Sequence, residues 1–311
     1  MEIGYYLGGT YVDVFLLLSA YLLGLGSRNK IANNPWQFMK KRGARIIPTY
    51  YVFLTITFLI IVFILGLDTL QWKQIFSHYL FLNWFWESSR IYIPPLPNIG
   101  HLWFMSCIIF GYLSVVIWSI LSNKIGFLNS NRGWVTYFII WAVISTLLTI
   151  RIRFAVYPCT VMTGFIILYF RGQEIMGYIR TINTYLLVFL LIFCNVGGIV
   201  YYLGGGYSYP PLIFWINLLN AVLWIACAPL IFNQYKISNA VLFVSTISFE
   251  IYLIHHPFCL GAYSLKHYMP TWLASVCVFV ISILGGWILS LLTSTVAKIK
   301  LTDKYMSRKS N

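Results

Sequence analysis

Apolar runs of about 20 residues constrain this chain more than any other feature, because a helix of that length crosses the roughly 30 Å hydrocarbon core of a bilayer. Backbone polar groups in lipid must be satisfied internally, so each run is predicted to be a helix. The nine predicted spans are Tyr6–Leu25, Ile46–Leu67, Leu102–Leu121, Trp134–Ile150, Phe154–Phe170, Thr181–Leu203, Leu212–Phe232, Val241–Leu260 and Trp272–Val296. The expected fold is all-α, a polytopic integral membrane helical bundle that forms a single domain over residues 1–311.

The composition excludes a soluble globule. Hydrophobic residues make up 60% of the chain and charged residues only 9%, whereas soluble domains carry about 25% charged residues. The net charge of +14 would suit nucleic-acid binding in a soluble domain, but in a membrane protein basic residues gather in the cytoplasmic loops. We therefore expect membrane lipids as partners, and no nucleic acid.

The basic residues also predict the orientation of the bundle. If the loop Gly26–Arg45 is cytoplasmic, that side collects all 21 lysines and arginines except Lys73, Arg90, Arg151, Arg153 and Lys266. This bias predicts an external N-terminus and a cytoplasmic C-terminus. No basic segment precedes the first apolar run, so a removable signal peptide is not expected.

The cysteines indicate neither a metal site nor a disulfide framework, because they lie in or beside the apolar runs without CxxC or Cys/His spacing. They are Cys107, Cys159, Cys194, Cys227, Cys259 and Cys277. The histidines, in contrast, all fall on or near the predicted outer side: His78, His101, His255, His256 and His267. The aromatic stretch His78–Trp86 is too short to span, so we expect it to lie at the interface or to re-enter the bundle.

Four polar stretches stand within or at the ends of the apolar runs. Asp13 interrupts the first run, and because an ionised group at a helix centre in lipid costs at least roughly 2.5–3.5 kcal/mol, it should face a bundle interior or a polar cavity. The other stretches are the basic segment Phe38–Tyr50, the segment His101–Ser106, and Ser248–Pro257.

In this order, the four stretches resemble the membrane acyltransferase-3 family of bacterial O-acyltransferases. The "VD-x-FF-x-LSG-[FY]-L" signature is similar to Val12–Leu22, with Leu16 and Ala20 replacing a usual Phe and Gly. The "HLWF" element falls at His101–Phe104. The "F-x-x-[KR]-R-x-x-R-I-x-P-x-Y" signature is matched at Phe38, Lys41, Arg42, Arg45, Ile46, Pro48 and Tyr50, and "S-x-x-IYLIH-x-P" at Ser248, Ile251 to His255 and Pro257.

The resemblance implies one further helix ahead of the aspartate motif, carrying an Arg or Lys and then, eleven positions later, the histidine usually held to be catalytic. Here only Met1–Leu7 precede Gly8. We expect either a start codon assigned too late or a truncated gene. The chain as written would then lack that base or acyl carrier and be impaired as an enzyme.

The basic segment is predicted to bind the donor. Arg42 and Arg45 lie three residues apart and share one helix face, and planar guanidinium groups can grip phosphate oxygens bidentately. With Lys41 they are expected to hold the phosphates of acyl-CoA, the donor that the resemblance implies, with no tightly bound cofactor and no metal. Anchoring in the anionic inner leaflet is the alternative, above all for the lysines.

A hydroxyl acceptor needs a general base, most often a histidine. His255 lies near the outer end of the eighth run, five residues after Glu250, and is the preferred candidate. Asp13 and Glu250 are further catalytic candidates, although Asp13 could instead neutralise a basic partner. Candidate substrate-binding residues are His101, Trp103, Tyr252 and Ser19, while His256 is expected to be interfacial.

The expected function is membrane-bound O-acyl transfer, with acetyl-CoA the commonest donor for the family. The expected acceptor is a hydroxyl of a cell-surface glycan, such as lipopolysaccharide, or of a lipid-linked sugar. The resemblance places the protein in a bacterial cytoplasmic membrane. Two alternatives remain: a transporter or flippase, which would also carry charges within its bundle, and a truncated, inactive family member.

Overall fold

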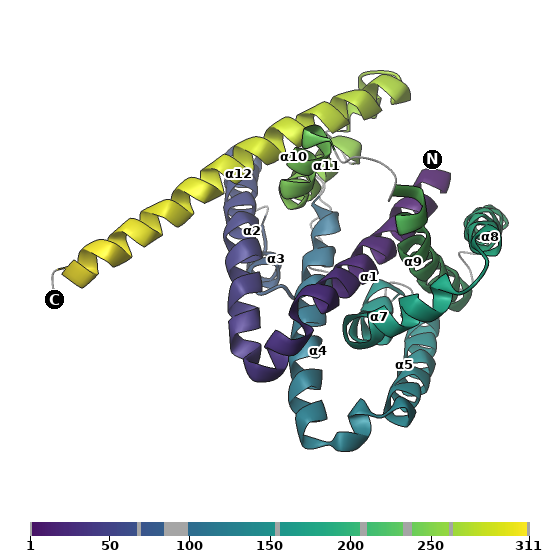
Figure 1. Ribbon diagram of the computed structural model, residues 1–311. Coiled ribbons are helices and arrows are strands. Elements are labelled where there is room, and N and C mark those ends of the chain that lie inside the picture. Colours follow the sequence, from purple (N-terminus) through teal and green to yellow (C-terminus); the bar gives the residue numbers. More distant parts are fainter. Residues whose placement is uncertain are drawn as a thin grey trace. The chain divides into compact units, whose positions relative to one another are not determined.

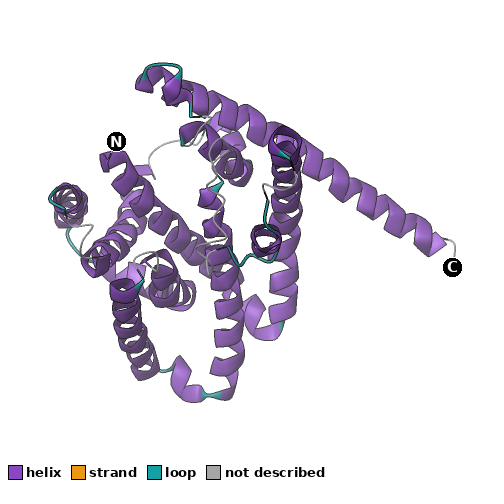
Figure 2. Cartoon of the chain, turned by 180° about the vertical axis from the view of Figure 1, so that it is seen from behind, coloured by secondary structure: helices purple, strands orange, loops and turns teal. Residues whose placement is uncertain are grey.

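The computed structural model describes residues 2–66, 70–83, 99–152, 156–205, 210–232, 238–260 and 264–309. Within these ranges every regular element is a helix and none is a strand (Figure 2). The predicted all-α fold is therefore confirmed.

Six helices in the described part of the chain are long and apolar enough to cross a membrane. They are Pro35–Ile64, Gly100–Lys124, Asn131–Arg151, Thr184–Leu203, Pro210–Leu230 and Thr271–Ser294. The first predicted run is also helical, with a shorter apolar part over Thr10–Gly26. The fifth run begins in residues 153–155, outside the described ranges, and is helical from Val156 onward. The chain is a multi-pass membrane bundle, as predicted.

The eighth predicted run, Val241–Leu260, is not one straight helix. It forms α10 (Asn239–Thr246) and α11 (Ser248–Cys259), bent by 74° at Ile247. The Thr246 hydroxyl donates to the carbonyl oxygen of Phe243 at 2.7 Å, and the Ser248 hydroxyl to that of Ser245 at 3.0 Å. Such side-chain bonds to the backbone compete with the helical ladder, which explains why an apolar run breaks here.

Helix packing divides the chain into two compact units. The first contains Met1–Met39 and Cys107–Lys236, and the second contains Lys40–Ser106 and Ile237–Asn311. The boundary falls inside α2 (Pro35–Leu65) and inside α4 (Trp103–Lys124). A single domain over residues 1–311 stays a prediction.

The first unit is built around α1 (Glu2–Asn33), which lies beside α7 (Ile166–Arg180) and α9 (Pro210–Phe232) (Figure 1). Its other elements are most of α4, a 3-10 turn at Gly126–Asn129, α5 (Asn131–Arg151), α6 (Val156–Thr160), a π-helical turn at Val161–Phe165 and α8 (Thr184–Leu203). Leu16 and Leu17 of α1 are fully buried and form part of the core.

The contact between α1 and α7 depends on a small residue. A Cβ placed on Gly24 would lie 2.2 Å from the carbonyl oxygen of Tyr169, closer than any side chain permits. Small residues at such crossings let membrane helices approach closely, because packing rather than hydrophobic exclusion holds helices together in lipid.

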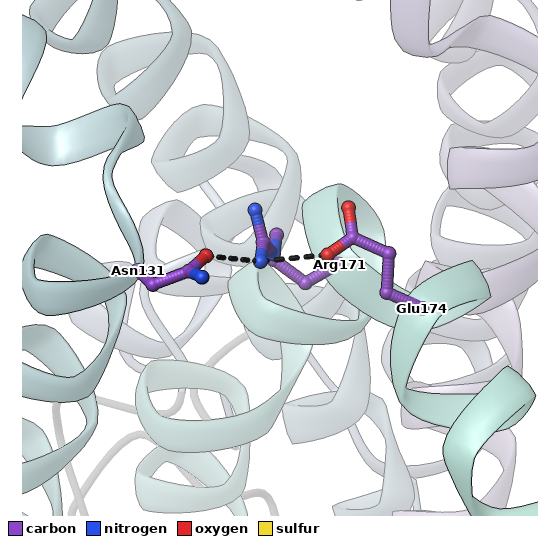
Figure 3. A network of polar contacts seen from close by, with 3 residues as sticks. All are labelled: Asn131, Arg171 and Glu174. Atoms are coloured by element: carbon purple, nitrogen blue, oxygen red, sulfur yellow. Dashed lines mark hydrogen bonds and ion pairs between the residues drawn. The ribbon is translucent and has the colours of Figure 1, made fainter.

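Polar side chains join helices within the first unit. Asn195 of α8 and Asn220 of α9 exchange two amide hydrogen bonds, at 2.9 and 3.1 Å. Arg171 of α7 donates to Asn131 at the start of α5 at 2.6 Å and forms an ion pair with Glu174 at 2.6 Å (Figure 3). Because this ion pair is partly exposed, it contributes about 1 kcal/mol at most.

The second unit contains most of α2, α3 (Trp72–Tyr79), the 3-10 turn Gly100–Leu102, α10, α11, a 3-10 turn at Leu265–His267 and α12 (Thr271–Lys309). Helix α11 packs along α12 (Figure 1). Gly286 permits this contact, since a Cβ there would lie 2.9 Å from the backbone nitrogen of Ile251.

Helix α3 is tied to α2 by tyrosines. The Tyr50 hydroxyl donates to the carbonyl oxygen of His78 at 3.1 Å, and the Tyr51 hydroxyl to that of Tyr79 at 2.7 Å. The predicted interfacial stretch therefore begins at the end of a short helix packed on α2. Its tryptophans, Trp84 and Trp86, lie outside the described residues.

Candidate active site

Two reciprocal hydrogen bonds join the His101–Phe104 motif to α11 in the second unit. The Tyr252 hydroxyl donates to the carbonyl oxygen of His101. In return, Nε2 of His101 lies 3.2 Å from the carbonyl oxygen of Leu253. Because a carbonyl oxygen only accepts, Nε2 carries the ring proton and Nδ1 is the basic nitrogen of His101.

The basic nitrogen of His101 lies inside the protein. The side chain is 6% exposed, and within the described part of the chain its Nδ1 atom has no hydrogen-bond partner. A buried acceptor without a partner loses the hydrogen bond that water would give it. Nδ1 of His101 therefore keeps an unused hydrogen-bond acceptor.

His255 is oriented by a backbone carbonyl of its own helix. Its Nδ1 atom lies 2.7 Å from the carbonyl oxygen of Tyr252. That carbonyl selects the tautomer with the proton on Nδ1, which leaves the lone pair on Nε2. The ring is half-buried, and its centroid lies 5.6 Å from that of His101.

His256, which was predicted to be interfacial, belongs to the same cluster. Its ring stacks on His101 with centroids 4.4 Å apart and planes inclined by 19°. The doubled histidine was visible in the sequence, but its contact with a residue far away in the chain was not. We refer to His101, Tyr252, His255 and His256 as the histidine cluster.

The remaining predicted substrate-binding residue of this unit is Trp103. It follows the cluster directly and is half-buried, with its ring 6.3 Å from that of Phe104. Phe104 in turn packs against Tyr252 at 5.0 Å. The HLWF motif therefore supplies His101 to the cluster, and its aromatic residues Trp103 and Phe104 follow directly in the chain, with Phe104 packed against Tyr252.

Glu250 lies in the first turn of α11, directly after the bend at Ile247. A carboxylate in the first turn is stabilised by the positive end of the helix dipole, and Arg45 lies close enough to act on it electrostatically. One oxygen of Glu250 is buried without a hydrogen-bond partner among the described residues.

The three predicted donor-binding residues lie together near the start of α2. Lys41 and Arg45 are exposed, while Arg42 is half-buried. Arg42 and Arg45 share a face of the helix, as their spacing predicted. Because Arg45 acts on Glu250, this basic face lies next to the first turn of α11.

The other two predicted site residues belong to the first unit. Asp13 is completely buried, and neither carboxylate oxygen has a hydrogen bond in the described structure, although Thr160 and Asn217 lie beside it. Ser19 uses its hydroxyl within α1, donating to the carbonyl oxygen of Phe15 at 2.7 Å. The predicted site residues therefore divide between the two units, eight in the second and two in the first.

No group of three or more His, Cys, Asp or Glu side chains that could hold a metal ion occurs in the described ranges. In the histidine cluster, the rings of His101 and His256 stack on each other, and the rings of His101 and His255 are hydrogen-bonded to backbone carbonyl oxygens. Its chemistry is that of bases and hydrogen-bond acceptors.

A multi-pass helical bundle with a partly buried histidine cluster defines an integral membrane protein. A family model described as an acyltransferase domain matches residues 1–291. The chain belongs to this family, the membrane acyltransferase-3 family that its motifs resemble, and it is an acyltransferase. Neither the curated proteins nor the solved structures gave a match.

Proposed function

We propose that this membrane acyltransferase moves an acyl group, most simply acetyl, from acyl-CoA to a hydroxyl of a cell-surface glycan or lipid-linked sugar. The observation that carries the proposal is His255, whose Nδ1 atom is bound to a backbone carbonyl so that Nε2 is the base. A hydroxyl acceptor requires such a base, which contributes about 10²- to 10⁴-fold in rate.

In the proposed reaction, Nε2 of His255 takes the proton as the acceptor oxygen attacks the thioester carbonyl carbon. The tetrahedral oxyanion then collapses, the carbon–sulfur bond breaks, and the coenzyme A sulfur leaves with the proton that the histidine returns. Nδ1 of His101 accepts a hydrogen bond from a neighbouring hydroxyl of the acceptor and orients it.

Helix α11 supports a path between donor and base. Arg45 and Glu250 mark its first turn, and His255 follows five residues later, about 7.5 Å along the helix axis. An acyl-CoA whose phosphates are held by Arg42, Arg45 and Lys41 would extend its thiol arm along this helix. We propose that the phosphates lie on the cytoplasmic side of a bacterial inner membrane, where the C-terminus also lies.

The test uses the purified protein in phospholipid vesicles with radiolabelled acetyl-CoA and a lipid-linked sugar. We expect label in the sugar, at least about a hundredfold less with His255→Gln, and unchanged transfer with the exposed control His267→Gln. Arg45→Ala should raise the KM for acetyl-CoA, whereas Arg180→Ala should not. Equal transfer by wild-type and His255→Gln protein would contradict the role of His255.

The acyl group and the sugar would be named by mass spectrometry of surface polysaccharide from cells with and without the gene. A mass difference of one acetyl group on a defined sugar would support both parts of the proposal. An unchanged polysaccharide would direct attention to an acceptor outside the cell-surface glycans.

A further inference from the structure

An apolar groove of about 380 Å³ lies within the second unit, between α2, α11 and α12. Phe53, Thr57 and Leu289 form its floor and are all buried. Its rim is formed by four isoleucine and leucine residues that are 41–53% exposed: Ile56, Ile60, Ile288 and Leu292. Thr57 is the only hydroxyl-bearing residue in the lining.

The environment of this groove determines what can enter it. Its α2 and α12 walls belong to helices that are long and apolar enough to cross the membrane, so its rim opens toward hydrocarbon rather than water. A polar or charged ligand would lose its hydration there without gaining hydrogen bonds. A hydrocarbon chain suits both the lining and the volume, which lies at the lower end of the 300–1,000 Å³ typical of ligand pockets.

The groove is elongated along α12. Its lining on that helix runs from Ile281 to Leu292, a rise of about 16 Å, which is close to half of the roughly 30 Å hydrocarbon core. The groove thus has the length to hold a chain segment comparable with one leaflet.

The groove and the histidine cluster meet on α11. Ile254, Pro257 and Phe258 line the groove and occupy one face of the helix, at spacings of three and four residues. His255 projects about 60° from Phe258 around the helix axis, since successive residues are rotated by about 100°. The edge of the groove is therefore next to the proposed base.

Gly285 makes room for this arrangement. A Cβ on Gly285 would lie 2.9 Å from a side-chain carbon of Ile254, so a larger residue on α12 would press on the α11 wall beside His255. A lipid that merely surrounds the protein would not need a recess on the helix that carries His255.

From these observations we propose that the groove holds the hydrocarbon tail of a lipid-linked acceptor, so that the sugar at the end of the lipid phosphate is presented to His255. This inference rests on the proposed function, because it assigns the substrate class of the same site. The tail is in an apolar environment both in the groove and in bulk lipid. Its preference for the groove therefore comes from packing against the lining, and not from leaving water.

The first test reports binding without catalysis. A diazirine-bearing polyprenyl phosphate is photo-cross-linked to the protein in nanodiscs, and the labelled residues are mapped by mass spectrometry. A diazirine-bearing phosphatidylethanolamine serves as the second arm. We expect the polyprenyl probe to label Ile60 and Ile288 in preference to Leu59, a residue of α2 that is 63% exposed and lies outside the groove lining.

Matched substitutions sharpen this test. Ile60→Trp should fill the groove and reduce labelling of Ile288, whereas Leu59→Trp should leave it unchanged. Ile288→Trp, with Leu284→Trp as its control, fills the groove from the opposite wall. Equal labelling of the groove by phosphatidylethanolamine, or labelling that neither Ile60→Trp nor Ile288→Trp reduces, would overturn the proposal.

The second test compares a lipid-linked sugar with the same sugar lacking its tail. Ile60→Trp should raise the KM for the lipid-linked acceptor at least about threefold, a modest change because the tail leaves one apolar environment for another. The KM for the tail-less sugar should not change. If no acceptor is acylated while groove labelling holds, the proposed reaction fails but the tail site stands; unchanged KM values in an active enzyme would overturn the tail site alone.

Discussion

Tyr252 and His101 lie 151 residues apart in the chain, and the tyrosine hydroxyl donates a hydrogen bond to the histidine's own carbonyl oxygen. The histidine ring bonds in turn to the carbonyl oxygen of Leu253. Both bonds connect the 3-10 turn Gly100–Leu102, directly before α4, to the middle of α11. They hold the ring of His101 5.6 Å from that of His255, and each ring is oriented by a backbone carbonyl rather than by a carboxylate.

Removing the Tyr252 hydroxyl should loosen this connection. Tyr252→Phe keeps the ring contacts but deletes one hydrogen bond to a buried residue, which should cost about 1 kcal/mol of stability. Because the bond positions His101, the KM for the acceptor should rise as well. Thermal unfolding and acceptor kinetics measure the two effects, and the exposed Tyr268→Phe is the control. An unchanged KM would show that the bond is only structural.

His255 and His256 should differ although they are neighbours. His255→Ala removes the proposed base and should lower kcat about 10²- to 10⁴-fold. His256→Ala removes only the ring stacked on His101, so it should mainly change the KM for the acceptor. A steady-state comparison of both variants decides the matter, and a larger kcat loss in His256→Ala would transfer the role of base to that residue.

The helical architecture could be predicted from sequence because lipid leaves the backbone few choices. The bend at Ile247 could not, since it depends on hydroxyls of Thr246 and Ser248 turning back to local carbonyls. Periodicity and hydropathy record the apolar character of this run but not the competition between a side chain and the helical ladder.

Sequence motifs drew attention to most residues of the histidine cluster, but not to its geometry. His101, Tyr252 and His255 stood out through their motifs, whereas the stacking of His256 on His101 depends on tertiary packing. The apolar groove was likewise invisible, because its lining looks like any other part of three apolar runs. Motifs identify chemical groups, while contacts between distant helices determine their roles.

Asp13 offers a test that separates chemistry from stability. Its carboxyl is fully buried and lacks a hydrogen bond in the described structure, so Asp13→Asn, which replaces the acid with an amide of nearly the same volume, should leave the thermal midpoint unchanged or raise it. If Asp13 takes part in catalysis, acyl transfer should fall in the same variant. A lower midpoint with normal specific activity would instead show that the acid is a structural partner.

The crossing of α1 and α7 should not tolerate a side chain at Gly24. Gly24→Ala places a methyl group against the carbonyl oxygen of Tyr169, and the forced separation of the helices should cost roughly 1–3 kcal/mol. Gly177→Ala is the matched control on α7, because nothing lies within 4 Å of its Cβ position. It should be neutral or stabilising by up to about 1 kcal/mol. Unfolding in detergent by tryptophan fluorescence compares the two.

His78 should make the second unit sensitive to acid. It lies in α3, outside the spans, and burial lowers the pKa of its imidazole from 6.5 to about 4. The folded protein therefore keeps His78 neutral where the unfolded chain is protonated. Stability is complete above about pH 6.5 and is lost as the pH falls toward 4, by up to roughly 3 kcal/mol.

The substitution His78→Gln isolates this effect, because glutamine can still donate to the Gln74 carbonyl that His78 Nδ1 meets at 2.8 Å but does not titrate. Thermal midpoints of both proteins are measured from pH 7.5 to 4.5. We expect the wild-type midpoint to fall more steeply than that of the variant below pH 6.5, with the difference between them growing as the pH decreases. Parallel curves would mean that His78 is protonated as easily in the folded protein as in the unfolded chain, and that α3 does not shield it from water.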